Sequence, residues 1–174
     1  MDQIDIIERN VQRTAKLLPG LPVTEALLSR VILLVGRVLA AHIDEVISPH
    51  QLTDVEFRTL LALFSVGDTA ASPGDLCAGV AQSPASMTRI GDNLVARKLI
   101  TRVLSDEDRR RMDIKLTPQG AALVREVLPR MFDYTRDLYR DFSKAEKARL
   151  LADLKRLYAR IMQDEAAGET SAQA

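Results

Sequence analysis

The side chains best suited to chemistry in this 174-residue sequence form a charged run in which three acids precede three arginines. The run is Asp106-Glu107-Asp108-Arg109-Arg110-Arg111, and Ser105 precedes it. Guanidinium groups donate hydrogen bonds to phosphate oxygens and base edges, so three in succession suit contact with nucleic acid. A charge run by itself is more often a solvated loop. Its meaning therefore depends on the elements that position it.

A second set of polar side chains falls on one face of a helix predicted over 84–97. Ser83 suits the N-cap and Pro84 the first helical position. Helical spacing directs four residues inward: Met87, Ile90, Gly91 and Leu94. The opposite face carries small or hydrogen-bonding residues: Ala85, Ser86, Thr88, Arg89 and Asn93. Small side chains let a helix approach a groove, and polar ones can reach base edges and phosphates. The alternative interpretation is an ordinary exposed helix face.

The remaining candidates for chemistry are few. We find no nucleophile–base pair, no phosphate loop and no spacing of metal ligands, so we expect neither an enzyme nor a cofactor nor a metal site. The single cysteine, Cys77, cannot form an internal disulfide, and we expect it to be buried; the alternative is a redox sensor. His42 and His50 are expected to be structural, although His42 is a weak candidate for lining an effector pocket.

The elements around these residues are mostly helical. Three Ser/Thr-x-x-Asp/Glu boxes predict helix starts, at Thr53–Glu56, Ser72–Asp75 and Ser143–Glu146. Apolar periodicity then predicts helices over 2–17, 24–47, 53–66, 72–80, 84–97, 118–142 and 143–165. The segments 99–104 and 112–117 are β-branched or alternate with period two, which predicts a β-hairpin whose tip is the charged run.

The order of these elements indicates a winged helix. A short helix over 72–80, a tight turn and a second helix form a helix-turn-helix, and the hairpin follows at once. Charge supports the assignment: segment 83–115 holds eight Lys and Arg against five Asp and Glu, whereas 51–82 holds one against four. The predicted fold class is mainly α (α+β), a winged helix-turn-helix with a two-stranded hairpin wing and a helical dimerisation region.

Composition is consistent with one soluble cytoplasmic domain. Apolar residues make up 47%, and 24 basic residues balance 24 acidic ones, which excludes a highly charged disordered chain. The longest aliphatic stretch, 31–41, contains Arg37 and is short for a membrane span, so no membrane partner is expected. The N-terminus is acidic where a secretory signal is basic.

Apolar faces that a winged helix cannot cover predict a homodimer. The candidate interface residues are Leu27, Leu28, Val31, Leu150, Leu154, Leu157, Tyr158 and Ile161. A two-fold dimer presents its recognition helices about 34–36 Å apart, and therefore reads a pseudo-palindromic site. The expected division is an N-terminal helical extension over 1–22, a dimerisation region over 23–50 and 121–165, the winged helix over 51–120, and a disordered tail over 166–174.

Three segments resemble the MarR family of bacterial transcriptional regulators. They are Ser-Pro-Ala-Ser-Met-Thr-Arg-Ile-Gly-Asp-Asn-Leu at 83–94, Asp-Glu-Asp-Arg-Arg at 106–110 and Leu-Thr-Pro-Gln-Gly at 116–120. The resemblance covers about 24–165 and is most specific in the wing. Within the family, Arg-Glu-Val-Leu-Pro at 125–129 and the stretch 22–30 look most like the EmrR/MprA branch, which represses multidrug-efflux operons.

The resemblance implies roles for individual residues. Arg110 would enter the minor groove with Asp108 holding its guanidinium, while Arg109 and Arg111 would reach phosphates. Base and phosphate contacts would come from the recognition helix, where Gly91 departs from good helix-forming composition. Close packing against the 72–80 helix would explain that glycine. The full set of expected DNA-contacting residues is Ser83, Ala85, Ser86, Thr88, Arg89, Asn93, Asp108, Arg109, Arg110 and Arg111.

The sequence therefore predicts a homodimeric DNA-binding regulator acting at the nucleoid. Membership of the family would imply a repressor of a multidrug-efflux or stress operon. A small phenolic or lipophilic effector would release it from a palindromic operator in double-stranded DNA. Two alternatives stay open at this point: a helical protein-interaction adaptor, and a repressor that senses oxidants through Cys77.

Overall fold

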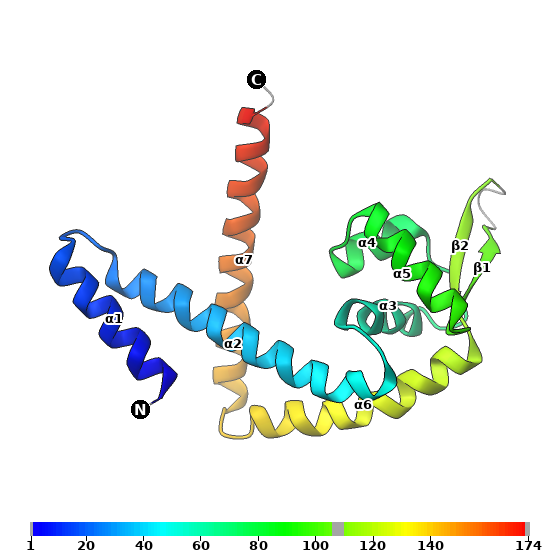
Figure 1. The fold of residues 1–174 in the computed structure, drawn as a ribbon, viewed down its shortest axis with the longest axis horizontal. Coiled ribbons are helices and arrows are strands. Elements are labelled where there is room, and N and C mark those ends of the chain that lie inside the picture. Colours follow the sequence, from blue (N-terminus) through cyan, green and yellow to red (C-terminus); the bar gives the residue numbers. More distant parts are fainter. Residues whose placement is uncertain (1, 106–109, 173–174) are drawn as a thin grey trace. The chain divides into compact units, whose positions relative to one another are not determined.

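The computed structural model describes residues 2–105 and 110–172, and side chains as far as residue 164. The chain divides into two compact units, 1–129 and 130–174. Each is described here by itself. The first unit holds α1 (Gln3–Leu17), α2 (Val23–Ile47), η1 (Ser48–His50), α3 (Asp54–Ser65), α4 (Pro73–Val80), α5 (Pro84–Ala96), β1 (Ile100–Leu104) and β2 (Met112–Leu116) (Figure 1). Helix α6 (Pro118–Leu138) crosses the boundary, and α7 (Lys144–Ala172) belongs to the second unit.

The first two helices pack against each other, and Val11 of α1 is almost fully buried. Helix α2 extends well beyond the aliphatic stretch 31–41 on which the sequence interpretation relied. Taken with η1, it spans Val23–His50 and contains an 18-residue window with a mean hydropathy of 1.8, so by length and composition alone it could cross a membrane. The sequence interpretation counted only an unbroken aliphatic run and missed that a few interspersed polar residues leave the helix apolar on average.

Each helix of the helix-turn-helix begins at a residue that satisfies exposed backbone N–H groups. Thr53 Oγ1 accepts from Glu56 N at 3.3 Å, while the Glu56 carboxylate accepts from Thr53 N at 2.8 Å. Ser72 and Ser83 cap α4 and α5 through the hydroxyl alone, which accepts from Asp75 N and from Ser86 N, and each serine is followed by proline. The predicted helix starts are therefore confirmed, because capping chemistry is local in sequence.

The wing is an antiparallel hairpin whose register runs from Ile100 opposite Leu116 to Leu104 opposite Met112. Its second strand is also paired on the other edge. Ala71 and Ile114 exchange two backbone hydrogen bonds of 2.9 Å, one in each direction. The sequence interpretation saw only the hairpin, because a single bridging residue leaves no alternating pattern.

The core of the first unit is aliphatic and lies among α3, α4, α5, β1 and the start of α6. Its largest fully buried apolar side chains are Ile47 at the end of α2, Phe57, Leu60, Leu63, Val80, Leu94, Val124 and Val127. Gly120 lies where the chain leaves β2 for α6, and a Cβ there would collide with the Leu99 carbonyl oxygen. Thr117 begins α6: its Oγ1 accepts from Gly120 N and donates to Lys98 O at 2.7 Å. Glycine is thus required for the close approach of α6 to the backbone of Leu99, the residue before β1.

Three expectations about helices need correction. Helix α6 ends at Leu138 rather than 142, because the chain turns before the capping box of Ser143 and Glu146. Residues 166–172, expected to be disordered, continue α7; the alanines and glutamate there favour helix. Gly91 does not pack tightly on α4, since a Cβ there would meet only Arg102 Nη2 at 3.6 Å.

Candidate nucleic-acid interface

The recognition helix α5 buries the face that its spacing predicts. Met87, Ile90 and Leu94 are at most 8% exposed, and Gly91 is also buried. The opposite face is exposed at Ala85, Thr88, Arg89 and Asn93, while Ser86 is half-buried. Ser83 Oγ accepts from Ser86 N at 3.3 Å, so Ser83 serves as the N-cap. The helix therefore presents small and polar residues outward.

The outward residues of α5 differ in the hydrogen bonds that they make within the chain. Thr88 Oγ1 donates to Pro84 O at 3.0 Å within its own helix. Asn93 is tied more firmly, because its Nδ2 donates to Glu56 Oε1 of α3. Arg89 is exposed and makes no hydrogen bond or ion pair with the part of the chain that the structure describes. Arg89 thus suits a phosphate or base contact, whereas Asn93 holds the recognition helix against α3.

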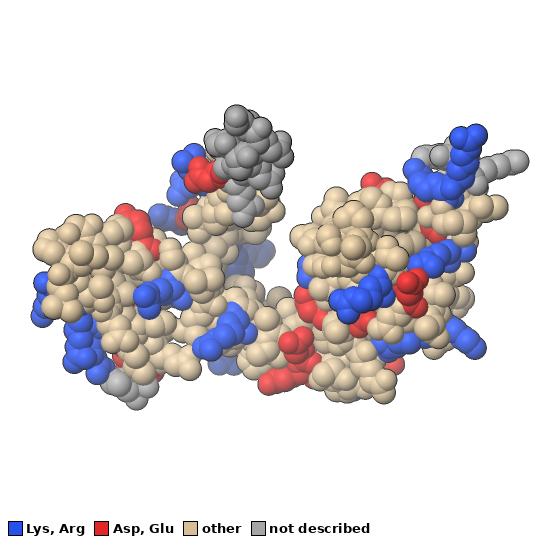
Figure 2. All heavy atoms as spheres, turned by 45° about the horizontal axis from the view of Figure 1, so that its top comes forward, with Lys and Arg blue, Asp and Glu red and all other residues tan. Residues whose placement is uncertain are grey.

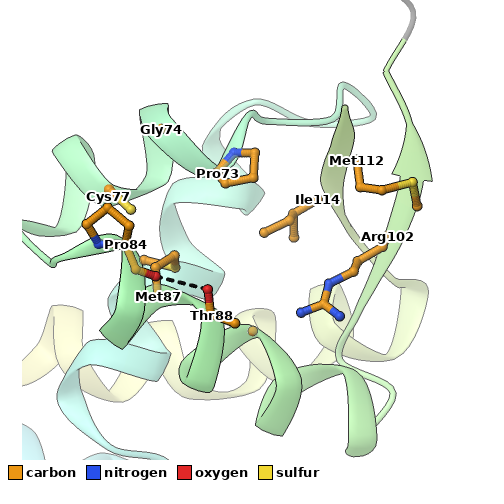
Figure 3. A pocket seen from close by; sticks show the side chains of 10 residues that line it. Pro73, Gly74, Cys77, Pro84, Met87, Thr88, Arg102, Met112 and Ile114 are labelled. Atoms are coloured by element: carbon orange, nitrogen blue, oxygen red, sulfur yellow. Dashed lines mark hydrogen bonds between the residues drawn. The ribbon is translucent and has the colours of Figure 1, made fainter. Parts of the chain in front are cut away.

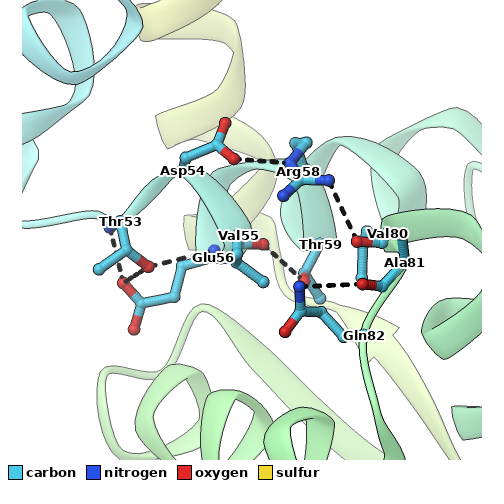
Figure 4. A network of polar contacts seen from close by, with 9 residues as sticks. All are labelled: Thr53, Asp54, Val55, Glu56, Arg58, Thr59, Val80, Ala81 and Gln82. Carbon is cyan, nitrogen blue, oxygen red and sulfur yellow. Dashed lines mark hydrogen bonds and ion pairs between the residues drawn. The ribbon is translucent and has the colours of Figure 1, made fainter. Parts of the chain in front are cut away.

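Two arginines that the sequence interpretation left without a role fix the helix-turn-helix. Arg58 of α3 donates from Nη1 to Val80 O at 3.1 Å and from Nε to Asp54 Oδ2 at 2.8 Å (Figure 4). It therefore holds the carboxyl end of α4, where Ala81 has a left-handed backbone. Arg58 is the single basic residue of the acidic segment 51–82, and this was the only feature of the sequence that could have indicated its structural role.

Arg97 performs the second attachment, at the carboxyl end of α5. Its Nη1 donates to Gln51 O at 2.6 Å and its Nη2 to His50 O at 2.8 Å. These carbonyls lie at the junction of η1 and α3, directly after the long helix α2. Backbone acceptors carry no sequence signature, so this contact could not be predicted.

The wing holds the expected arginines in different environments. Asp108 and Arg109 lie outside the described residues. Arg110 is described and exposed. Arg111, expected to reach phosphates, is directed to its own sheet: its Nε lies 2.9 Å from Asp113 Oδ1, and its Nη2 lies 3.0 Å from Ser105 Oγ. Hydrogen bonds from Arg111 and Ser105 hold the pKa of Asp113 below its ordinary value.

An ion pair joins the wing to the recognition helix. Arg102 Nη2 of β1 lies 2.5 Å from Asp92 Oδ1 of α5, and both side chains are partly exposed. Gly91, beside Asp92, lies close to the same guanidinium: a Cβ at Gly91 would be 3.6 Å from Arg102 Nη2. In Figure 2, basic side chains lie beside the hairpin tip at the upper right and over the face below it. The two candidate DNA-contacting elements are therefore adjacent and linked.

A cavity of about 340 Å³ lies between α4, α5 and the wing (Figure 3). Its walls are mostly apolar and include Met87, Met112 and Ile114, with Arg102 as the cation. Cys77 also lines it and is half-buried, which corrects the expectation of full burial. His42 is not among the lining residues; its Nδ1 lies 3.2 Å from Glu45 Oε2 on α2.

Comparison with known proteins assigns the family. Residues 50–111 match the MarR family model. The HTH-type transcriptional regulator PecS of Dickeya dadantii is 34% identical over 131 residues, which cover 75% of this chain and 76% of PecS. The chain belongs to the MarR family. It is therefore a DNA-binding transcriptional regulator with a winged helix-turn-helix, and regulators of this family are not enzymes.

Two further relatives extend the comparison of this MarR-family chain. The transcriptional repressor MprA of Escherichia coli K12 is 29% identical over 162 residues, covering 93% of this chain and 92% of MprA. A solved structure of Bordetella bronchiseptica BpsR, described as regulated in its DNA binding by 6-hydroxynicotinic acid, matches with a TM-score of 0.66 at 27% identity. That match covers 75% of this chain and 91% of BpsR. The predicted resemblance to MarR regulators is thereby confirmed.

Proposed function

We propose that the chain is a homodimeric repressor that binds a pseudo-palindromic operator and is released by a small molecule. The observation that carries the proposal is the exposed face of α5, with Arg89 outward and Arg102–Asp92 joining the helix to the wing. A groove-reading helix beside a basic hairpin is the arrangement by which winged helices contact DNA. The expected contacts at Ser83, Ala85, Ser86 and Thr88 belong to the same surface.

The dimer is supported by apolar side chains that a single chain leaves exposed. On α7, Leu150, Leu154 and Leu157 are 40–42% exposed, Ile161 is 48% and Tyr158 is 64%. On α2, Leu28 is 58% exposed, while Leu27 and Val31 are half-buried. Exposed apolar side chains that follow one face of a helix, as they do on α2 and separately on α7, mark interaction sites. A second copy of the chain would cover it, which also accounts for the high hydropathy of α2 in a cytoplasmic protein.

The proposed target is inferred from resemblance to a relative, and the proposed class of effector is inferred from the cavity. Resemblance to the MprA branch favours a multidrug-efflux or stress operon. The cavity has the size of a small-molecule site, and apolar walls with one cation suit a phenolic or lipophilic acid. An anion that draws Arg102 away from Asp92 would favour one arrangement of wing and recognition helix over another, which is what release requires.

The test is selection of duplexes from a random DNA library by the purified full-length protein, followed by sequencing. We expect enrichment of an inverted repeat whose half-site centres lie about 10 base pairs apart. Repeating the selection with aromatic acids and phenols should reduce recovery for an effector. Recovery of no common sequence, or of single half-sites only, would contradict the proposed dimeric operator binding.

A further inference from the structure

The base of the wing carries a polar cluster composed of Ser105, Arg111 and Asp113, which we call the wing clasp. Arg111 Nε donates to Asp113 Oδ1 at 2.9 Å, and its Nη2 lies 3.4 Å from Asp113 Oδ2. The same Nη2 donates to Ser105 Oγ at 3.0 Å. Ser105 N also donates to Arg111 O at 2.9 Å, so a backbone rung closes the hairpin at this level. The clasp therefore joins both strands where they meet the tip.

Burial makes the wing clasp costly to open. Asp113 is 7% exposed and Ser105 is 3% exposed. A carboxylate removed from water requires a charged or hydrogen-bonding partner, and Arg111 supplies most of it. The lowered pKa of Asp113 has the same cause. Turning the Arg111 side chain toward a phosphate would take from the buried Asp113 carboxylate its charged partner and leave it only the Ser105 hydrogen bond.

The position of Asp113 attaches the wing clasp to the body of the first unit. The next residue, Ile114, exchanges backbone hydrogen bonds with Ala71, and it is itself buried. Asp113 also lies opposite Val103 in the hairpin register. The clasp is thus held on a strand paired at both edges. Arg110 is the residue adjacent to Arg111 on the side of the tip.

We propose that Arg111 is a positioning residue and not a phosphate contact, and that the wing clasp fixes the direction in which Arg110 leaves the sheet. The charge of Arg111 is offset by Asp113, so it adds little to attraction for the DNA backbone. The proposal rests on the DNA-binding function of the family, and it assigns different tasks to neighbouring arginines of one run.

The decisive variant is Asp113→Ala. Removing an acid near a DNA-binding surface ordinarily strengthens binding, because repulsion of phosphate is reduced. If the wing clasp positions the wing, Asp113→Ala should instead weaken DNA binding, by about tenfold. A change of that size is typical when one side chain of a shared hydrogen-bond network is removed. Asp68→Ala is the matched control, since Asp68 is exposed on a turn and carries the same charge. We expect that control to bind at least as tightly as the parent protein.

Arg111→Lys and the double variant Arg111→Ala/Asp113→Ala complete the experiment. Lysine keeps the charge but loses the planar fork, so a positioning role predicts the same loss as Arg111→Ala. The double variant should lose no more affinity than either single variant, because all three open the same clasp.

Affinity is measured by fluorescence anisotropy over a salt series, using a duplex recovered by selection. The slope of log affinity against log salt should stay unchanged.

Two outcomes would overturn the proposal. One is unchanged or tighter binding by Asp113→Ala. The other is a slope reduced by about one unit in Arg111→Ala with affinity retained in Arg111→Lys, which is the behaviour of a phosphate contact. Circular dichroism and size-exclusion chromatography on each variant separate loss of the clasp from loss of folding. Failure of the parent protein to bind any duplex would instead contradict the proposed operator function.

Discussion

At the residue scale, the arginines of this chain divide by their surroundings rather than by their type. Arg58 and Arg97 donate to backbone carbonyls and hold the helix-turn-helix together. Arg111 is directed to Asp113, whereas Arg89 and Arg110 are exposed on the recognition helix and wing. Arginine serves both purposes because its fork matches carbonyls and carboxylates as well as phosphates.

Arg110→Ala should weaken binding to the selected duplex by roughly 1–3 kcal/mol, because it removes the guanidinium that we propose enters a narrow minor groove. The dimer should stay intact, as size-exclusion chromatography would show. Fluorescence anisotropy measures the affinity. Unchanged affinity would remove Arg110 from the interface.

The Asp113 carboxyl gives a pH prediction with a definite sign. Its pKa is lowered in the folded protein, so its stabilising contribution is present above the ordinary aspartate value and is lost as pH falls through the lower folded value. We expect the wing clasp to persist from about pH 8 down to about pH 4. NMR titration of the Asp113 side-chain carboxyl carbon checks this. Protonation above about pH 5 would contradict the clasp geometry.

At the element scale, the recognition helix is held by three attachments in its carboxyl-terminal part. Asn93 joins it to α3, Arg97 joins it to the η1–α3 junction, and Asp92 joins it to β1. These attachments leave its outer face exposed while fixing its orientation. The close approach of α6 to the Leu99 backbone, just before β1, depends on the absence of a side chain at Gly120.

Gly120→Ala should lower the free energy of unfolding by about 1–3 kcal/mol, because the added methyl meets the Leu99 carbonyl and the helix must shift. Gly79→Ala is the control: it lies in α4 with no neighbour within 4 Å, and alanine there should be neutral or stabilise by up to about 1 kcal/mol. Urea denaturation compares the two. Equal stability of both variants would show that α6 does not approach β1 so closely.

At the scale of the whole molecule, exposed apolar faces on α2 and α7 favour assembly with a second copy. Charge in the complete chain is balanced, so long-range attraction to DNA comes from local placement of basic residues rather than from net charge. A dimer doubles that local surface and imposes the half-site spacing.

Removing residues 143–174 should abolish dimerisation, because α7 carries most of the exposed apolar side chains proposed for the interface. The full-length variant Leu154→Asp/Leu157→Asp should also be monomeric, whereas Lys155→Asp, exposed on the same helix, should remain dimeric. Light scattering after size exclusion measures the mass. A folded dimer of the truncated chain would refute this interface.

The sequence by itself determined where the helices begin, the hairpin and the inward face of α5, because each depends on residues only a few positions apart. It also supplied the motif that places the chain among MarR regulators. Tertiary structure alone decided which arginines hold the fold together. Partners such as Glu56 for Asn93, or the His50 carbonyl for Arg97, lie 37 and 47 residues away. Such pairings depend on how the helices pack, which no local pattern records.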